Sequence, residues 1–326
     1  MAKVDFIEGV FNVNVLSLFD GCSCGQQALK EQGMSIKNYY ASEINKDAMK
    51  ITQDNHPNTI QLGDVEELLK LDEYGNIVVI GDDLKKLPKI DMLIGGSPCQ
   101  GISRAKSGKL DLKDARSRLF FNYIAIRNWL IDNNNPDLIW LLENVVPNQP
   151  TLEIMNEATG VEPIYINSSH FVAQYRPRLY WTNIDVKESE LPCESGFTIK
   201  DIMQDEHGEK VKNLVEEGYA KTIKWGKNYM QWDTSGKGYY SQQNRARYTN
   251  AKMNTLTKSN GGDKTRIYLG KDEYGVYYRN ASVEELELLQ GLPIGYTDIL
   301  KSKGKRRGII GDGWTIPVIK WILSFI

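Results

Sequence analysis

An alternation of apolar strand, short turn and amphipathic helix limits the fold of this chain more than any other feature. The switch occurs three times near the start of the chain, in NVLSLFDGCSCGQQALKEQG (14–33), NYYASEINKDAMKITQDN (38–55) and TIQLGDVEELLKL (59–71). Two more buried strands are predicted in KIDMLIGGSPCQG (89–101) and DLIWLLENVVP (137–147), with a helix over 116–133 between them. Strands that alternate with helices form a mainly parallel sheet with helices on both faces. We therefore expect an α/β fold with a doubly wound, mainly parallel sheet.

The regular alternation ends near residue 186. Residues 162–184 predict two antiparallel strands, whereas residues 187–278 are polar, basic, weakly periodic and rich in Gly, Asn and Tyr. A short helix over 282–293, stopped by glycine and proline, and an apolar segment over 312–326 follow. A chain of 326 residues can form one large domain and a smaller one. We predict a larger domain over 1–186, completed by 295–326, and a smaller, loop-rich domain over 187–294.

Positive charge is concentrated in the smaller predicted domain. The whole chain carries a net charge of −2, but residues 218–271 hold eleven Lys or Arg against two Asp, which gives this stretch +9. Aromatic residues such as Trp225, Tyr229 and Tyr268 are interleaved with the basic ones, and a second basic run, KSKGKRR, follows at 301–307. The stretch is either a solvated basic surface or a surface for a partner, because side chains of this kind contact nucleic-acid phosphates and base edges.

Several classes of protein do not fit the sequence. The apolar runs are shorter than a membrane span, and the start of the chain lacks the basic and apolar regions of a signal peptide. Four cysteines (Cys22, Cys24, Cys99 and Cys193) are too few for a disulfide framework in a chain of this size. Cys22 and Cys24 have no second cysteine pair or histidine cluster with the spacing of zinc ligands. We expect a cytoplasmic protein with no membrane partner and no metal.

Polar residues stand where successive strands are predicted to end. Phe19, Asp20 and Gly21 follow the first strand, Glu43 ends the second and Asp64 follows the third. In doubly wound sheets ligands bind at these ends, and an acid on the second strand commonly binds ribose hydroxyls. Each residue alone fits a simple strand–helix turn or a helix N-cap equally well or better. Together, on successive strands, they favour a nucleoside-bearing cofactor.

Cys99 lies in a turn after the fourth predicted strand. A free cysteine is more often a small core residue, but the turn and the neighbouring Pro98 and Gln100 favour a nucleophile, whose thiol would need a lowered pKa or a nearby cation. Arg176 and Arg178 alternate along one strand face, and are either solvated or available as that cation. Glu143 ends the apolar strand over 137–147, as a paired structural carboxylate or as a buried acid able to donate a proton.

These stretches, in this order, resemble the cytosine-carbon-5 DNA methyltransferases over nearly the whole chain. FDGCSCG resembles the first cofactor turn, ASEIN the ribose acid, GDV the adenine contact, GGSPCQGIS the nucleophile loop, RSRLFF the segment behind it, LENV the acid and QYRPR the Gln-x-Arg-x-Arg strand. RNASVEELELLQGLP and GDGWTIPVIKWI resemble the segments that follow target recognition. SPCQG looks bacterial or phage-like, whereas VLSLFDG and WTIPVI resemble the vertebrate de novo branch.

The resemblance has two departures. Cys22 and Cys24 stand in the first turn where the family usually has small residues or glycine. Asp312 and Gly313 stand where the family more often has Asn or Arg followed by Ser. Both departures fall on segments that the resemblance assigns to the cofactor pocket.

The resemblance implies a class I S-adenosylmethionine-dependent methyltransferase, with catalysis in the larger domain and target recognition in 187–294. Cys99 would attack carbon 6 of a flipped-out cytosine in double-stranded DNA, Glu143 would hold or protonate nitrogen 3, and Arg178 with Arg176 would stabilise the adduct. Carbon 5 would then take the methyl group, leaving S-adenosylhomocysteine.

The cofactor-binding residues implied in this way are Phe19, Asp20, Gly21, Gly25, Glu43, Ile44, Asp64, Val65, Pro98, Leu119, Asp312 and Trp314. The DNA-binding residues are Gln100, Ser103, Arg245, Arg247 and Lys258. Such an enzyme is expected to act as a monomer on DNA, for example as the companion of a restriction enzyme.

Two alternatives stand beside this hypothesis. One is an RNA methyltransferase of the same fold acting on tRNA, but that branch normally shows a Cys-Phe-Thr tripeptide, which this sequence lacks. The other is a non-catalytic regulator that has kept only the fold. The intact Cys99, Glu143 and Gln174-x-Arg176-x-Arg178 argue against it.

Overall fold

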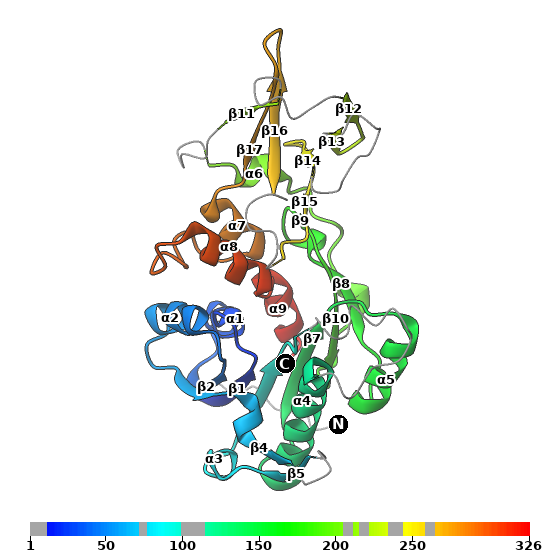
Figure 1. The fold of residues 1–326 in the computed structure, drawn as a ribbon. Helices are drawn as coiled ribbons and strands as arrows, with labels where there is room; N and C mark the ends of the chain where they lie inside the picture. Colours follow the sequence, from blue (N-terminus) through cyan, green and yellow to red (C-terminus); the bar gives the residue numbers. More distant parts are fainter. Residues whose placement is uncertain are drawn as a thin grey trace.

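Seven strands form the larger sheet of the computed structural model, which describes residues 12–71, 77–98, 115–204, 211–214, 222–233, 244–257 and 265–326 (Figure 1). The strand order is β3-β2-β1-β6-β7-β10-β8. The strands are β1 (Val13–Leu18), β2 (Ile36–Ser42), β3 (Ile60–Gly63), β6 (Met92–Gly95), β7 (Ile139–Asn144), β8 (Ile164–Asn167) and β10 (Pro177–Thr182). The first five in this order are parallel, and β10 is antiparallel to both β7 and β8. This confirms the doubly wound, mainly parallel sheet and its antiparallel pair.

Side chains alternate along each strand, so every strand presents side chains to both faces of the sheet. Helices cover both faces. On β1, Val15 packs in a cluster with residues of α1, α2 and α9, whereas Leu16 and Leu18 pack in a second cluster with α4 and α5. The α-helices are α1 (Cys24–Glu31), α2 (Lys46–Asn55), α3 (Asp82–Lys85), α4 (Ala115–Asn133), α5 (Gln149–Thr159), α6 (Ile199–Ile202), α7 (Val283–Gln290), α8 (Lys303–Asp312) and α9 (Ile316–Leu323). The short 3-10 helices are η1 (Val65–Leu68), η2 (Ser168–His170) and η3 (Glu188–Glu190).

Local sequence signals fix several helix ends. The Asn45 side chain caps α2, and Ser282 with Glu285 forms a capping box at the start of α7. α7 ends at Gly291, whose φ of 72° lies in the left-handed region that glycine adopts without strain. The predicted helix over 282–293, stopped by glycine, is confirmed.

The third strand-to-helix switch is the part of the alternation that was predicted wrongly. After β3 the chain makes only the single turn η1, and then β4 (Leu69–Leu71) pairs antiparallel with β5 (Ile77–Ile80). The run IVVI at 77–80 is apolar and rich in β-branched residues, which favour strand pairing over helix.

A second sheet lies apart from the first, at the top of Figure 1. Its order is β11-β17-β16-β14-β13-β12, and its own small core includes Met230, Trp232 and Tyr278. The strands are β11 (Lys212–Asn213), β12 (Thr222–Trp225), β13 (Tyr229–Asp233), β14 (Arg245–Arg247), β16 (Arg266–Lys271) and β17 (Val276–Asn280). The region predicted to be loop-rich therefore contains a regular six-stranded sheet.

The two sheets are joined by a short parallel ribbon and by helices. β9 (Gln174–Tyr175) pairs with β15 (Met253–Asn254), and α7 and α8 lie between the sheets (Figure 1). Leu286 and Leu289 of α7 pack in the same cluster as Ile319 of α9. Side chains from the two sides of the domain boundary predicted after residue 294 are thus packed together. No helix in the described ranges is long and apolar enough to span a bilayer.

Candidate active site

The carboxyl ends of β1 and β6 meet where the strand order reverses, which is the place where doubly wound sheets bind ligands. The turn after β1 holds two non-glycine residues in the left-handed region, Phe19 with φ 58° and Ser23 with φ 57°. Such residues cost of the order of 1–3 kcal/mol each and cluster at ligand sites. The conformation of this turn therefore costs stability and indicates a ligand site.

Asp20 is half-buried in this turn. Its carboxylate accepts hydrogen bonds from the hydroxyls of Ser23 and of Tyr39, the latter at 2.8 Å. Burial raises the pKa of Asp20 to about 6, and the charge of Glu43 adds to the shift, although the hydroxyl donors oppose it. A carboxylate in this position titrates close to physiological pH.

Glu43 ties the end of β2 to the same turn. Its Oε2 accepts from the backbone N–H of Gly21 at 2.8 Å, and its Oε1 accepts from Ile44 and Asn45 at 2.8 and 2.7 Å. The Ile44 side chain beside it is 70% exposed. A carboxylate next to a bare apolar side chain suits a nucleoside, with the acid at the ribose and the isoleucine against the base.

Asp64, the third strand-end acid, caps η1 by accepting from the backbone N–H of Glu66 at 2.9 Å. The N-cap role that the sequence left open is therefore present. Val65 is buried in the cluster against which Phe19 and Leu119 pack, so these three predicted cofactor residues lie together. Their contact with a cofactor stays a prediction.

The indole of Trp314 lies between the first turn and the segment after β6. A Cβ added to Gly96 would lie 2.7 Å from Trp314 Nε1 and 3.0 Å from Glu143 Oε2. A Cβ added to Gly25 would lie 3.4 Å from the same indole. The absence of a side chain at Gly96 therefore lets Trp314 and the Glu143 carboxylate both lie against this segment. At Gly25 the close neighbour of an added Cβ is instead Ile94 Cδ1, at 2.6 Å.

Cys24 and Gly313, one residue from each of the two departures from the family pattern, lie against each other. A Cβ added to Gly313 would lie 2.9 Å from Cys24 Sγ, closer than real Cβ contacts. Cys24 is buried, and its Sγ is 3.7 Å from that of Cys22. The larger side chain in the first turn is thus accommodated by the missing side chain at position 313.

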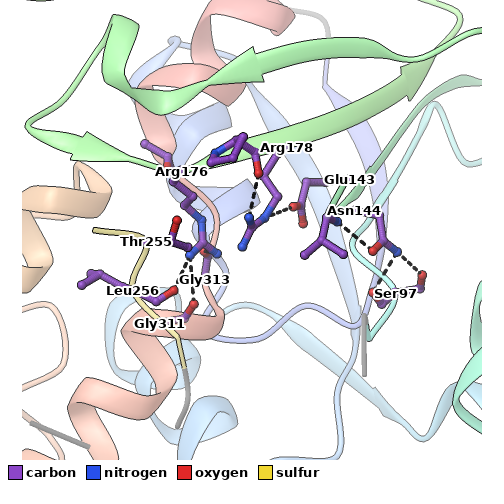
Figure 2. Close-up of polar contacts among 12 residues, drawn as sticks. Ser97, Glu143, Asn144, Arg176, Arg178, Thr255, Leu256, Gly311 and Gly313 are labelled. Carbon is purple, nitrogen blue, oxygen red and sulfur yellow. Dashed lines mark hydrogen bonds and ion pairs between the residues drawn. The ribbon is translucent and has the colours of Figure 1, made fainter. Parts of the chain in front are cut away.

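Glu143 and Arg178 form a buried ion pair at the carboxyl edge of the sheet (Figure 2). Arg178 Nε donates to Glu143 Oε1 at 2.8 Å, and the two side chains are only 13% and 11% exposed. The next residue, Asn144, donates to the carbonyl and hydroxyl of Ser97 at 3.2 and 2.9 Å. Strand β7 therefore carries Glu143 and, through the side chain of Asn144, is hydrogen-bonded to Ser97 at the start of the loop that leads to Cys99.

Arg176 points elsewhere, although it precedes Arg178 by two residues. Figure 2 shows its guanidinium among the backbone carbonyls of Leu256, Gly311 and Gly313, to which it donates at 2.7, 3.2 and 2.9 Å. The two arginines expected on one strand face thus serve different partners. Arg176 is not in hydrogen-bond contact with Glu143.

On the smaller sheet, Arg245 and Arg247 lie on one face of β14, with guanidinium carbons 4.5 and 5.3 Å from the ring centroid of Tyr229. Arg247 also donates to Asn254. No carboxylate within the described ranges forms an ion pair with either arginine. Arg247 borders a cleft of about 480 Å³ with Asn228 among its other lining residues. Cys99, Gln100, Ser103 and Lys258 lie outside the described residues.

A profile of the C-5 cytosine-specific DNA methylases matches residues 13–326 of this chain. The chain belongs to this family.

Relatives and solved structures agree with this assignment. The orphan methyltransferase M.SPRI of Bacillus phage SPR is 32% identical over 206 residues, which cover 59% of this chain and 42% of that protein. The type II methyltransferase M.NgoBV of Neisseria gonorrhoeae is 24% identical over 327 residues, covering 84% of this chain and 70% of that protein. The structure of Spodoptera frugiperda DNMT2 shares the fold, with a TM-score of 0.63, 18% identity, and 96% and 99% of the two chains covered. The match thus spans less than half of the phage relative.

Some residues of this C-5 methylase site were missed from the sequence. Asn144 and Gln290 are buried polar residues within apolar segments, and each is hydrogen-bonded to a distant part of the site. A polar residue inside an apolar run was the available signal. Arg306 and Arg307 of the second basic run are buried as well; Arg306 contacts Glu287 and Asp298 at 3.2 and 2.5 Å. Only part of that run is therefore exposed.

Proposed function

We propose that this chain is a DNA methyltransferase that transfers a methyl group from S-adenosylmethionine to carbon 5 of a flipped-out cytosine in a short duplex target. The observation that carries the proposal is the buried Glu143–Arg178 pair beside Ser97 and Pro98, directly before Cys99 in the chain. It lies at the same sheet edge as the turn bound by Glu43. Membership of the C-5 cytosine methylases supports the reaction class.

Cys99 is assigned as the nucleophile from its place in the chain and from the family. Its thiolate adds to carbon 6 of the cytosine, so a carbon–sulfur bond forms and the electron pair of the 5,6 double bond moves toward carbon 5. Carbon 5 takes the methyl group, then loses its proton, and the returning electron pair expels the thiolate. Glu143 holds nitrogen 3 while this charge develops. Arg178 holds Glu143 in place and supplies the positive charge that stabilises the adduct.

The residues around the first turn fit the family's cofactor. When bound, S-adenosylmethionine supplies an electrophilic methyl group on a sulfonium. Glu43 presents a carboxylate already fixed by three backbone N–H groups, and exposed Ile44 offers an apolar surface for the base. Gly21, with φ 60° and no atom within 4 Å of an added Cβ, leaves open space beside them. Pro98 and Asp312 complete the proposed set with Trp314.

Double-stranded DNA is the proposed partner, and residues 187–294 are the proposed recognition domain. Arg245 and Arg247, held on Tyr229, are available for phosphates or base edges. Extruding the cytosine costs a few kcal/mol, which contacts to the flanking duplex must offset. We propose a monomer on DNA, acting in the cytoplasm of a prokaryotic or phage-infected cell; the phage and Neisseria relatives support this setting.

Cys99→Ser tests the proposal. Because a hydroxyl is far less nucleophilic than a thiolate near pH 7, we expect methyl transfer to be abolished while DNA and cofactor binding persist. Bisulfite sequencing of DNA from a host that expresses the wild type should show methylated cytosines in one sequence context. Wild type should also form an irreversible adduct with 5-fluorocytosine DNA, since fluorine cannot leave carbon 5 as a proton does. Methylation of tRNA with unmodified DNA, or turnover by Cys99→Ser, would overturn the assignment.

A further inference from the structure

Three segments that carry different parts of the site meet at one buried joint (Figure 2). β9 leads along the chain to Arg178, β15 follows β14 of the smaller sheet along the chain, and residues 310–315 carry Trp314. β15 pairs with β9 in parallel, with Met253 opposite Gln174. The joint is therefore the place where the smaller sheet, the ion pair and the cofactor side of the site share hydrogen-bonded backbone.

The Arg176 guanidinium connects two of these segments. One of its terminal nitrogens donates to Leu256 on the β15 side and to Gly311 on the other, and the second nitrogen donates to Gly313. Burial, with a smaller contribution from the charge of Arg178, lowers the pKa of Arg176 to about 10, so the group stays protonated near neutral pH. A single cation thus bridges carbonyls of two segments that are far apart in the chain.

Two fully buried glutamines make a second connection between the same segments. Gln174 Oε1 accepts from the backbone N–H of Leu256 at 3.0 Å, and its amide nitrogen donates to Gln290 Oε1 at 3.3 Å. Gln290 in turn donates to the carbonyl of Ile310 at 2.9 Å and accepts from the Thr315 hydroxyl at 2.8 Å. Because buried polar groups are costly to leave unpaired, the joint resists a shift of one segment alone.

Each end of the joint leads to a residue that faces a proposed ligand. At the recognition end, Asn254 of β15 accepts from Arg247 of the smaller sheet. At the other end, Trp314 packs against Gly25 and Gly96, which border the cofactor turn and the nucleophile loop. Asn254 and Trp314 therefore lie at opposite ends of one connected set of hydrogen-bonded groups.

We propose that Arg176 is a positioning residue that couples DNA binding at the smaller sheet to cofactor binding at the larger sheet, and that it does not contact the reacting base. The inference rests on the proposed function, because coupling requires both ligands. Coupled sites commonly change each other's affinity by 5- to 150-fold, and the effect is reciprocal. We expect each ligand to tighten binding of the other by about tenfold in the wild type.

Arg176→Lys is the test, since an ammonium keeps the charge but cannot reproduce the fork that binds separate carbonyls. Calorimetry with S-adenosylhomocysteine, with and without a duplex that contains the target, measures the coupling factor. We expect the factor to fall from about ten to near one, while each ligand alone binds within about threefold of wild type. The reverse titration, of duplex into protein with and without S-adenosylhomocysteine, must give the same factor.

Arg127→Lys is the matched control. Arg127 is a buried arginine whose guanidinium donates to the carbonyls of Thr159 at 2.8 Å and Ala158 at 3.3 Å, between α4 and α5. Arg127→Lys should lower the free energy of unfolding without changing the coupling factor. Thr315→Val is a milder change at the joint, because it removes one hydroxyl donor to Gln290. It should give an intermediate factor even where Arg176→Lys fails to fold.

A wild-type coupling factor of one overturns the proposal. So does an unchanged factor in Arg176→Lys, and if the adduct on 5-fluorocytosine DNA is lost as well, the arginine acts on the base itself. If the wild type binds neither S-adenosylhomocysteine nor DNA, the proposed function fails instead, and this outcome is distinct from binding of both ligands without coupling.

Discussion

The two sheets of this molecule hold their charges in opposite ways. At the carboxyl edge of the larger sheet, Glu143 is paired with Arg178 and Asp20 accepts from two hydroxyls, so each charge has an internal partner. On the smaller sheet, Arg245 and Arg247 lie over Tyr229, and no described carboxylate is paired with them. The first region is organised before any ligand arrives, whereas the second keeps positive charge available for an anionic partner.

Because of this contrast, we expect the two regions to respond to different solution conditions, namely pH and salt concentration. Buried carboxyl groups respond to pH and to packing, because burial opposes their ionised form. Cations that bind phosphates respond to salt, because phosphate binding releases counterions. We therefore expect variants of the larger sheet to change pH dependence or stability, and variants of the smaller sheet to change salt dependence.

Asp20→Asn has the largest expected effect. Burial raises the pKa of Asp20 from 3.8 to about 6, so the folded protein keeps this proton after the unfolded chain has lost it. The contribution of Asp20 to stability is fully present below 3.8 and is lost as pH rises to about 6. The shift corresponds to about 3 kcal/mol. The variant has no such loss, so its free energy of unfolding relative to wild type should rise by about 3 kcal/mol between about pH 3 and pH 8.

Denaturant titrations of both proteins without ligand, at the two pH values, measure this change. The pKa of Asp20 already includes the hydroxyl hydrogen bonds, which favour the ionised carboxylate, and any cost of the substitution that is independent of pH cancels in the comparison. A difference between variant and wild type that is independent of pH would show that Asp20 is not a buried titrating group.

The contact between Cys24 and Gly313 gives the second prediction. Gly313→Ala places a Cβ 2.9 Å from Cys24 Sγ, and overpacking of this kind costs about 1–3 kcal/mol. In a Cys24→Ala background the sulfur is gone, so the cost should fall by about 1 kcal/mol or more. Unfolding free energies of the four proteins form the cycle. Gly304→Ala, at an open position, is the control. Additive costs would contradict the contact.

The sequence was a good guide to this larger region where the signal is local. The strand periodicity placed Glu43 and Glu143 at the same carboxyl edge of one sheet, because parallel strands end at the same edge. It was a poor guide where the partner is distant. Arg176 binds carbonyls 80, 135 and 137 residues away, and no local pattern shows such a contact.

A run of charged residues was a poor guide for the same reason, because its partners lie in other elements of the chain. KSKGKRR at 301–307 is a basic run in the sequence, yet Arg306 is paired with Glu287 and Asp298. The acids that bind it precede it in the chain by a turn and a helix, so their pairing depends on how α7 and α8 pack. Asp64 shows the reverse case, since its capping bond to Glu66 was predictable from neighbouring residues alone.

Arg245→Gln and Arg247→Gln have the smallest expected effect and sharpen the comparison on the side of the smaller sheet. With about five to eight phosphate contacts, the log–log salt slope of DNA binding should be about −5 to −7 for wild type. Loss of one phosphate contact should reduce its magnitude by about 1, with cofactor binding unchanged. If an arginine reads a base instead, the slope should stay constant and the sequence preference should relax.

Fluorescence anisotropy over a salt series, with bisulfite sequencing of the methylated sites, separates these outcomes. Lys301→Gln, at an exposed position in the second basic run, is the control. Wild-type slope and wild-type preference in both arginine variants would place the recognition surface elsewhere, and a reduced slope in Lys301→Gln would place it on that run.

The packing of α9 against α1 has a consequence for biosynthesis. Ile319 and Ile322 of α9 are buried in one cluster with Ala28 and Leu29 of α1, so α1 is covered by a helix that is synthesised much later than α1. At about 5–20 residues per second, translation of the chain between these helices takes on the order of 15 to 60 s. During that interval the apolar face of α1 and the strands beneath it have no cover from α9, which exposes the nascent chain to chaperones and to aggregation. Efficient production of this protein should therefore depend on chaperone capacity while the chain between α1 and α9 is synthesised, and not on the smaller sheet, whose core is local.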